Sequence, residues 1–237
     1  MIKKLQALKA KKGFTLVELV VVIAIIGVLA AILIPVMIGV VQDANITSAD
    51  SLAKQIYSNT QTFCTKADTA KHSLKNTAAA VSGVYGVTAV KITVSNTSGA
   101  VVWTVDTTNV SDTATGTTLR FGDASKYKFS GTAGTDSSDM CLNLYLADTL
   151  RDFTSGLVYV YFSNGACVGA AVQQGDSTGA ELTSIATSIG DQYKTGAAKE
   201  INWPGAKAGV ASNSAIIGTS PKIGHNATAT AAGGETT

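Results

Sequence analysis

The pattern of hydrophobic and polar positions divides the chain into an apolar stretch, an amphipathic stretch and a longer region of short alternating runs. From Phe14 to Ile34 the only charged side chain is Glu18. A helix rises ~1.5 Å per residue, so roughly 20 apolar residues cross the hydrocarbon core of a bilayer. The pattern therefore predicts a membrane-spanning helix near the N-terminus.

After Pro35 the hydrophobic pattern becomes one-sided. Proline removes one main-chain hydrogen bond, so we expect a kink at Pro35 in a helix that continues beyond it. The helix should run to about Ala67, with residues 14–41 apolar on every side and residues 42–67 packed on a globular head. Small and apolar residues at steps of three and four define the face expected to be buried: Ala49, Leu52, Ala53, Ile56, Thr60, Phe63, Cys64 and Ala67.

Residues 68–225 have the composition of a β-rich head. β-branched residues in 87–96 and 99–108 flank a turn cluster at 96–99, and residues 156–174 form a second hairpin pattern around Asn164-Gly165. We expect short strands in 119–122, in 126–131 and beside Cys141, and short helical segments in 72–84, 148–153 and 176–193. Residues 226–237 lack apolar bulk and are predicted to be a mobile tail. The predicted fold class is α+β, a long N-terminal helix packed on an antiparallel sheet.

Charge orients the predicted membrane helix. Five lysines precede it without an acidic residue, so the N-terminus should stay cytoplasmic and the head should lie outside: Lys3, Lys4, Lys9, Lys11 and Lys12. Without these lysines, the 18 basic residues of the sequence fall to 13 against 16 acidic ones, a side-chain charge of −3. A net negative charge does not favour binding to nucleic acid, which is itself negatively charged, and we predict no such partner.

Two residues distinguish this stretch from a simple anchor. Gly13 precedes the apolar run, so cleavage after it would remove residues 1–13, the basic leader, and keep the helix. Glu18 costs about 2 kcal/mol or more in a membrane unless it is paired or interfacial. After cleavage, the new amine of Phe14 would lie on the same helical face as Glu18 and could pair with it within one chain or between chains. The alternative is a glutamate that reaches the headgroups.

The residues G-F-T-L-V-E, with the basic leader before them and the hydrophobic helix and Pro35 after them, resemble the N-terminus of type IV prepilins and pseudopilins. The resemblance covers residues 1 to about 65. It implies cleavage between Gly13 and Phe14 by a prepilin peptidase, N-methylation of Phe14, and polymerisation of copies of the chain through helices that contain Phe14 and Glu18. It also implies a pilus assembly platform and motor proteins as partners.

Three functions fit these features. The first is the structural subunit of a type IV pilus, single-pass in the cytoplasmic membrane with its C-terminus outside before assembly, and extracellular afterwards. The second is a minor pilin or pseudopilin of a secretion or DNA-uptake filament. The third is a monomeric membrane-anchored binding protein, against which Glu18 argues. The sequence has only His72 and His225 as candidate histidine bases and no phosphate-binding motif, so we predict no enzyme and no cofactor.

The three cysteines, Cys64, Cys141 and Cys167, all lie in the predicted exported part, where a disulfide can form. We favour a bond between Cys141 and Cys167, because both flank predicted short strands, with Cys64 packed as a small hydrophobic residue. A zinc site that adds His72 or an aspartate is an alternative, but no CxxC spacing supports it and no metal is predicted. The carboxylates of Asp136 and Asp139 could bind calcium, although a solvated loop is favoured.

Overall fold

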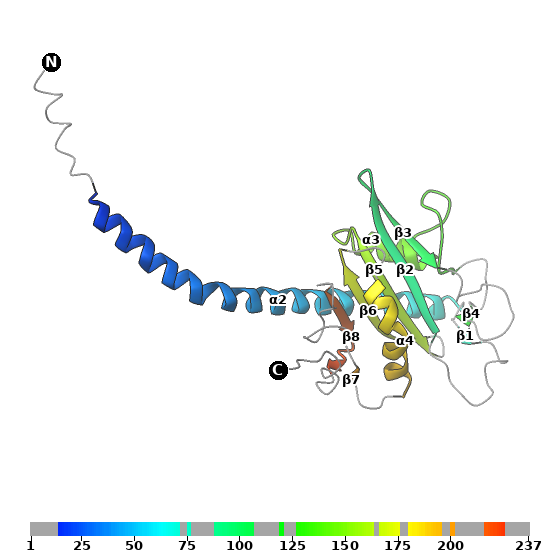
Figure 1. Ribbon diagram of the computed structural model, residues 1–237. Coiled ribbons are helices and arrows are strands. Elements are labelled where there is room, and N and C mark those ends of the chain that lie inside the picture. The colour runs from blue at the N-terminus through cyan, green and yellow to red at the C-terminus, as the bar shows by residue number, and fades with distance from the viewer. Residues whose placement is uncertain are drawn as a thin grey trace, which may run out of the picture. The chain divides into compact units, whose positions relative to one another are not determined.

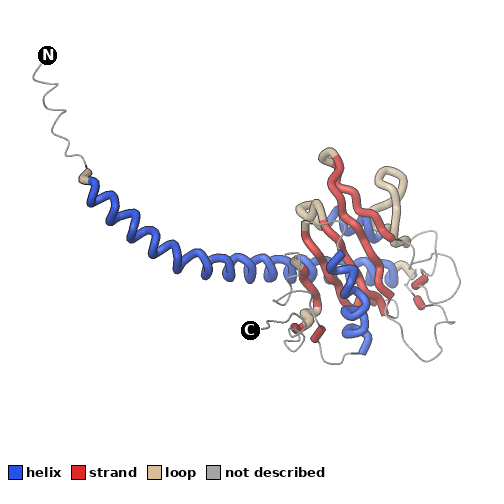
Figure 2. Tube along the Cα trace, in the orientation of Figure 1, coloured by secondary structure: helices blue, strands red, loops and turns tan. Residues whose placement is uncertain are grey.

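The computed structural model describes residues 14–71, 75–76, 88–106, 119–120, 127–163, 166–175, 180–195, 200–201 and 216–225. The leader, residues 1–13, and the tail, residues 226–237, lie outside these ranges. The chain divides into two units, Met1–Ala44 and Asn45–Thr237, and each is described by itself. Helix α2 (Leu16–Thr69) begins in the first unit and ends in the second (Figures 1 and 2).

The described part of the first unit is helical from Leu16 onward and buries none of its side chains within the chain. The segment Leu16–Ile34 is long and apolar enough to cross a membrane, and none of it is buried. The helix continues through Pro35, as expected, whereas the kink there stays a prediction.

The second unit is built around a five-stranded antiparallel sheet with the order β3-β2-β5-β6-β8. Both predicted hairpins are present. In the first, the Gly99 amide donates to Asn96 Oδ1 at 3.1 Å, and Ser98 and Gly99 adopt positive φ angles. The turn Asn164-Gly165 of the second lies outside the described residues. The strands are β2 (Thr88–Thr97), β3 (Ala100–Asp106), β5 (Gly156–Ser163), β6 (Ala166–Gln174) and β8 (Ile217–Ser220).

Among the described residues, four very short strands lie outside this sheet. β1 (Lys75–Asn76) pairs antiparallel with β4 (Leu119–Arg120), and β7 (Glu200–Ile201) pairs parallel with β9 (Gly224–His225). β4 falls within the strand expected over 119–122. The short helix expected in 72–84 is wrong at residues 75–76, which are extended and paired, and the rest of that range lies outside the described residues. The strand expected in 126–131 is reduced to a single bridge between Lys128 and Cys141.

Side chains alternate between two cores on opposite faces of the sheet. On β5, Val158, Val160 and Phe162 enter a core with α2 and α3 (Leu142–Thr149), whereas Leu157, Tyr159 and Tyr161 enter a core with α4 (Ala180–Thr195). A strand buried on both faces needs apolar residues at successive positions, and the run LVYVYF of β5 provides them. The head therefore has helices on both faces of its sheet (Figure 1).

The predicted buried face of α2 is confirmed in the second unit. Leu52 is half-buried, and the other predicted positions are at most 8% exposed: Ala49, Ala53, Ile56, Thr60, Phe63, Cys64 and Ala67. The helix ends at Thr69, two residues beyond the expected end, and Lys71 after it adopts a left-handed φ of 64°. This part of the chain was predictable because the 3.6-residue period repeats over several turns.

The segment beside Cys141 is a helix, not the predicted strand. The helical turn expected over 148–153 is confirmed only at residues 148–149, where α3 ends, and is wrong at residues 150–153. The letters L-N-L-Y-L alternate like a strand, but Leu142 and Leu146 share the buried face of α3 one turn apart. The side-chain amide of Asn143 donates to the carbonyl oxygens of Trp103 and Gly131, each at 3.1 Å. These contacts with strand β3 and the preceding loop stabilise the helix where local alternation favoured a strand.

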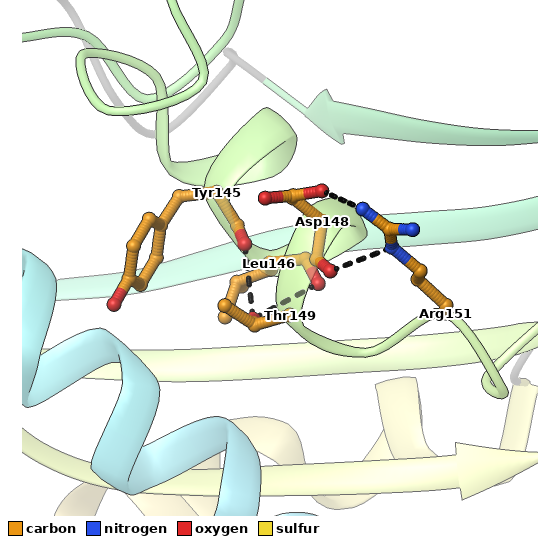
Figure 3. Close-up of polar contacts among 5 residues, drawn as sticks. All are labelled: Tyr145, Leu146, Asp148, Thr149 and Arg151. Atoms are coloured by element: carbon orange, nitrogen blue, oxygen red, sulfur yellow. Dashed lines mark hydrogen bonds and ion pairs between the residues drawn. The ribbon is translucent and has the colours of Figure 1, made fainter.

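The C-terminal end of α3 is held by side-chain hydrogen bonds (Figure 3). Arg151 Nη2 lies 2.6 Å from Asp148 Oδ1, and its Nε donates to the Asp148 carbonyl at 3.2 Å. The Thr149 hydroxyl donates to the Tyr145 carbonyl at 2.9 Å and accepts from Asn59 Nδ2 at 3.1 Å. Because the Arg151–Asp148 ion pair is exposed, its contribution to the stability of the head should be small. The bond between Asn59 and Thr149 links α3 to α2.

Helix α4 covers the second face of the sheet at the position predicted for 176–193. Its described bounds are Ala180–Thr195, and the expected apolar face is buried: Leu182, Ile185, Ala186 and Ile189. Its first turn is attached to the sheet by Gln173, whose side-chain oxygen accepts from the Leu182 amide at 2.9 Å. The first amides of a helix have no partner within the helix, so this bond satisfies one of them.

Replacing Gln173 by leucine should destabilise the head by about 1–3 kcal/mol, because the buried Leu182 amide would lose its acceptor. Urea unfolding of the purified chain measures this loss. The matched control is Gln174→Leu, which makes the same change on a half-buried side chain and should shift the free energy of unfolding by about 0.5 kcal/mol or less. Equal effects of the two variants would contradict the capping role.

Candidate functional site

The first candidate site is the N-terminal end of α2, where Thr15 and Glu18 form a reciprocal capping arrangement. Glu18 Oε2 accepts from the Thr15 amide at 2.9 Å and from the Thr15 hydroxyl at 2.7 Å. The Glu18 amide in turn donates to Thr15 Oγ1 at 3.2 Å. This is the capping box, in which an N-terminal threonine and a glutamate three residues later satisfy each other's backbone amides.

Sequence reasoning identified Glu18 but missed Thr15. The signal was present, since Thr15-Leu16-Val17-Glu18 has the spacing of a capping box before an apolar run. Glu18 therefore has a partner within its own chain, which the predicted pairing with the Phe14 amine did not include. Phe14 is 90% exposed. Gly13 lies outside the described residues, so cleavage and the amine pairing stay predictions.

The second feature of the site is the exposed apolar surface of α2. The large apolar side chains between Leu16 and Val41 whose exposure is described are each at least 47% exposed. Monomeric soluble proteins rarely expose apolar patches larger than a few hundred Å². This surface therefore needs lipid or other protein chains to cover it.

The cysteines are arranged differently from the predicted disulfide. The structure joins none of Cys64, Cys141 and Cys167 by a disulfide. Cys141 is the N-cap residue that precedes helix α3, and a Cβ atom at Gly131 would overlap its sulfur. Cys167 instead lies in the core that contains Cys64. The favoured Cys141–Cys167 bond depended on a strand beside Cys141, and that strand is a helix.

The metal alternatives gain no support from the positions of their ligands. Asp136 accepts from the Thr132 amide at 2.9 Å and lies 3.7 Å from Lys128 Nζ, while Asp139 lies 3.5 Å from Lys66 Nζ. In the described ranges, no group of three or more histidine, cysteine or acidic side chains could hold a metal ion. His72, which the zinc alternative used, lies outside those ranges.

Comparison with known proteins identifies one family model and two relatives. Residues 8–34 match the family model described as the prokaryotic N-terminal methylation motif. The chain is 35% identical over 123 residues to a fimbrial protein of Moraxella nonliquefaciens, and this alignment covers 47% of the chain and 77% of the relative. It is 36% identical over 118 residues to fimbrial protein EcpC of Eikenella corrodens, with 47% and 73% covered. No solved structure matches the chain.

Proposed function

Because the chain belongs to the type IV pilin family of structural, non-enzymatic fimbrial proteins, we propose that it is the structural subunit of a type IV pilus. The subunit is inserted in the cytoplasmic membrane as a prepilin with its head outside. It then polymerises through α2 into a surface filament. The observation that carries this proposal is the apolar surface of α2, which no described part of the chain covers.

Processing precedes assembly in this proposal. A prepilin peptidase cuts between Gly13 and Phe14, which removes all five leader lysines and creates a new amine, and this amine is N-methylated. The matched motif, residues 8–34, includes both sides of the bond to be cut. The assembly platform and motor proteins then move the subunit out of the bilayer, where α2 exchanges lipid contacts for contacts with neighbouring copies of α2.

Glu18 has a specific part in that exchange. Its capping bonds with Thr15 keep the helix end ordered in the single subunit. In the filament, its carboxylate pairs with the Phe14 amine of a neighbouring subunit, so that both charges are compensated in a medium of low dielectric constant. A carboxylate has further acceptor positions beyond the one used by Thr15, so capping and pairing are compatible.

Mass spectrometry of sheared surface filaments tests the proposal. This chain should be their main protein, with Phe14 as its N-terminal residue and one methyl group on the amine. A small share of the filament protein would instead indicate a minor pilin. Its absence from filaments, together with a monomeric membrane form, would indicate an anchored binding protein. An N-terminal Met1 would refute the processing step.

The small side chain at the cleavage site has its own test. Gly13→Ala should slow processing, so that a fraction of the chains keeps the leader and remains longer by residues 1–13, because a protease site shaped for glycine has little room for Cβ. Gly27→Ala is the matched control, since nothing lies within 4 Å of a Cβ atom placed there. Intact-mass measurement of membrane fractions distinguishes the two lengths. Complete processing of Gly13→Ala would show that the site accepts larger residues.

A further inference from the structure

A groove opens beside α2, where the long helix meets the loop before β5, the end of β6 and the residue before β8. Its space is about 680 Å³, which is more than one side chain fills. Six polar side chains that line it form no hydrogen bond or ion pair within the described part of the chain: Ser48, Gln55, Asp152, Thr154, Ser155 and Gln174. A partner that entered the groove would therefore meet free donors and acceptors and would break no bonds within the head.

The groove carries a negative charge, because Asp152 is the one charged residue among its described lining residues. Four other aspartates of the described head each lie within 3.7 Å of a basic side chain. Arg151, the residue next to Asp152, pairs with Asp148. Asp152 itself has no basic partner among the described residues. The groove therefore favours a cationic group and disfavours an anionic one.

A free cation lies on the same helix. Lys54 is exposed and forms no ion pair within the described ranges. Successive residues of a helix project about 100° apart, so Lys54 faces about a quarter-turn away from Gln55, and it does not line its own groove. Thr47 and Ser58 lie on the same side of α2 as Lys54, and both are exposed. Thr47, Lys54 and Ser58 form what we call the Lys54 face, which is small, polar and positively charged.

We propose that the groove receives the Lys54 face of a second copy of this chain, with Lys54 of one subunit paired with the Asp152 carboxylate of the next. The inference rests on the proposed function, because filament assembly brings the α2 helices of neighbouring copies together. The contact joins two different surfaces, so a bound copy still offers one of them to a further copy. Heterologous contacts of this kind build open filaments when the rotation between copies does not close a ring.

The walls of the groove strengthen this pair. An exposed ion pair contributes little, because water and salt screen it. In the groove, the apolar side chains of Leu52, Phe153 and Ile216 would lie near the charges and would exclude part of the water, so the attraction increases. A lysine ammonium group has three donors, and the side-chain oxygens of Gln55 and Gln174 provide acceptors beside the carboxylate.

Charge reversal in the full-length chain tests the contact. Asp152→Lys and Lys54→Glu should each lower the amount of sheared filament protein roughly tenfold or more, because like charges would then face each other between subunits. The variant with both changes restores opposite charges and should restore filaments. Asp68→Lys is the matched control, since Asp68 is also exposed, forms no ion pair within the described residues and lies outside the groove. It should leave the amount of filament unchanged.

Cysteine cross-linking locates the contact without changing the sign of a charge. One chain with Lys54→Cys and another with Asp152→Cys are produced in the same cells, and their filaments are oxidised with copper phenanthroline. Dimers that contain one chain of each kind should form, and such a bond cannot arise within one subunit. Each variant produced alone should stay unlinked at the new cysteine, because the contact joins two different surfaces.

Four results would overturn the proposal: normal filament yield from both single charge variants, no restoration in the combined variant, an equal loss in Asp68→Lys, or cross-links between two copies of the same cysteine variant. The amount and N-terminal mass of mature chain in membranes show that each variant is folded and processed. Absence of the unaltered chain from filaments would refute the proposed function. Filaments that form regardless of both charges would refute this contact alone.

Discussion

Replacing Gly218 by alanine should destabilise the head by about 3 kcal/mol, although the change adds one methyl group. Gly218 lies on β8 directly against α2, and a Cβ atom there would overlap the backbone carbonyl of Ala49. The obstacle is main chain, which no side-chain rotation removes. Strand β8 would therefore have to move away from the helix.

That movement would also break the contacts that fasten β8 to α2. Asp50 accepts from the Thr219 amide at 3.1 Å through one carboxylate oxygen, and Lys222 Nζ lies 3.0 Å from the other. Asp50 is the more buried member of the ion pair, with 21% of its side chain exposed. The clash at Gly218 thus costs packing and polar contacts together.

Thermal and urea unfolding of the purified chain measure the effect. The matched control is Gly190→Ala in α4, where the added Cβ would lie 3.2 Å from the Tyr161 ring, a close side-chain contact and not an overlap with main chain. Alanine also favours helix by about 1 kcal/mol over glycine, so this control should cost much less than Gly218→Ala. Native-like unfolding of Gly218→Ala would show that β8 does not depend on this approach to α2.

The long helix could be predicted from sequence because its evidence repeats. The apolar run and the three-to-four-residue period of its second half extend over many turns. Successive turns therefore give independent evidence for the same helix. The two hairpins were predictable for a similar reason, with alternation on both sides of a glycine-containing turn. Helix α3 shows the limit, because Leu142 to Leu146 alternate like a strand and only contacts with distant residues decide for helix.

The close approach of β8 to α2 could not be predicted from sequence. Nothing near Gly218 in the sequence indicates that Ala49 lies against it. The two residues are far apart in the chain, and their contact depends on how β8 packs on α2 after the sheet has formed. Thr15 is a different case, because the spacing of Thr15 and Glu18 predicts a capping box, whereas the charge of Glu18 favours the Phe14 amine as its partner.

Replacing Glu18 by glutamine should abolish filament assembly while leaving the helix end and processing intact. Glutamine keeps an acceptor oxygen for the Thr15 amide, so the capping box persists. It carries no charge to pair with the Phe14 amine of a neighbour. Removing one partner of a buried ion pair costs about 3–5 kcal/mol, which corresponds to a loss of more than ~100-fold in association.

Thr15→Ala provides the opposite change, because it removes the capping hydroxyl and keeps the carboxylate. It should weaken the helix end by about 1 kcal/mol and still yield filaments. Glu18→Val removes both properties and should fail like Glu18→Gln. Sheared filament protein is measured for each variant, with the mass of the N-terminal peptide as proof that cleavage before Phe14 occurred. If Glu18→Gln assembled normally and Thr15→Ala did not, Glu18 would serve to cap the helix, and the charge pairing between subunits would be refuted.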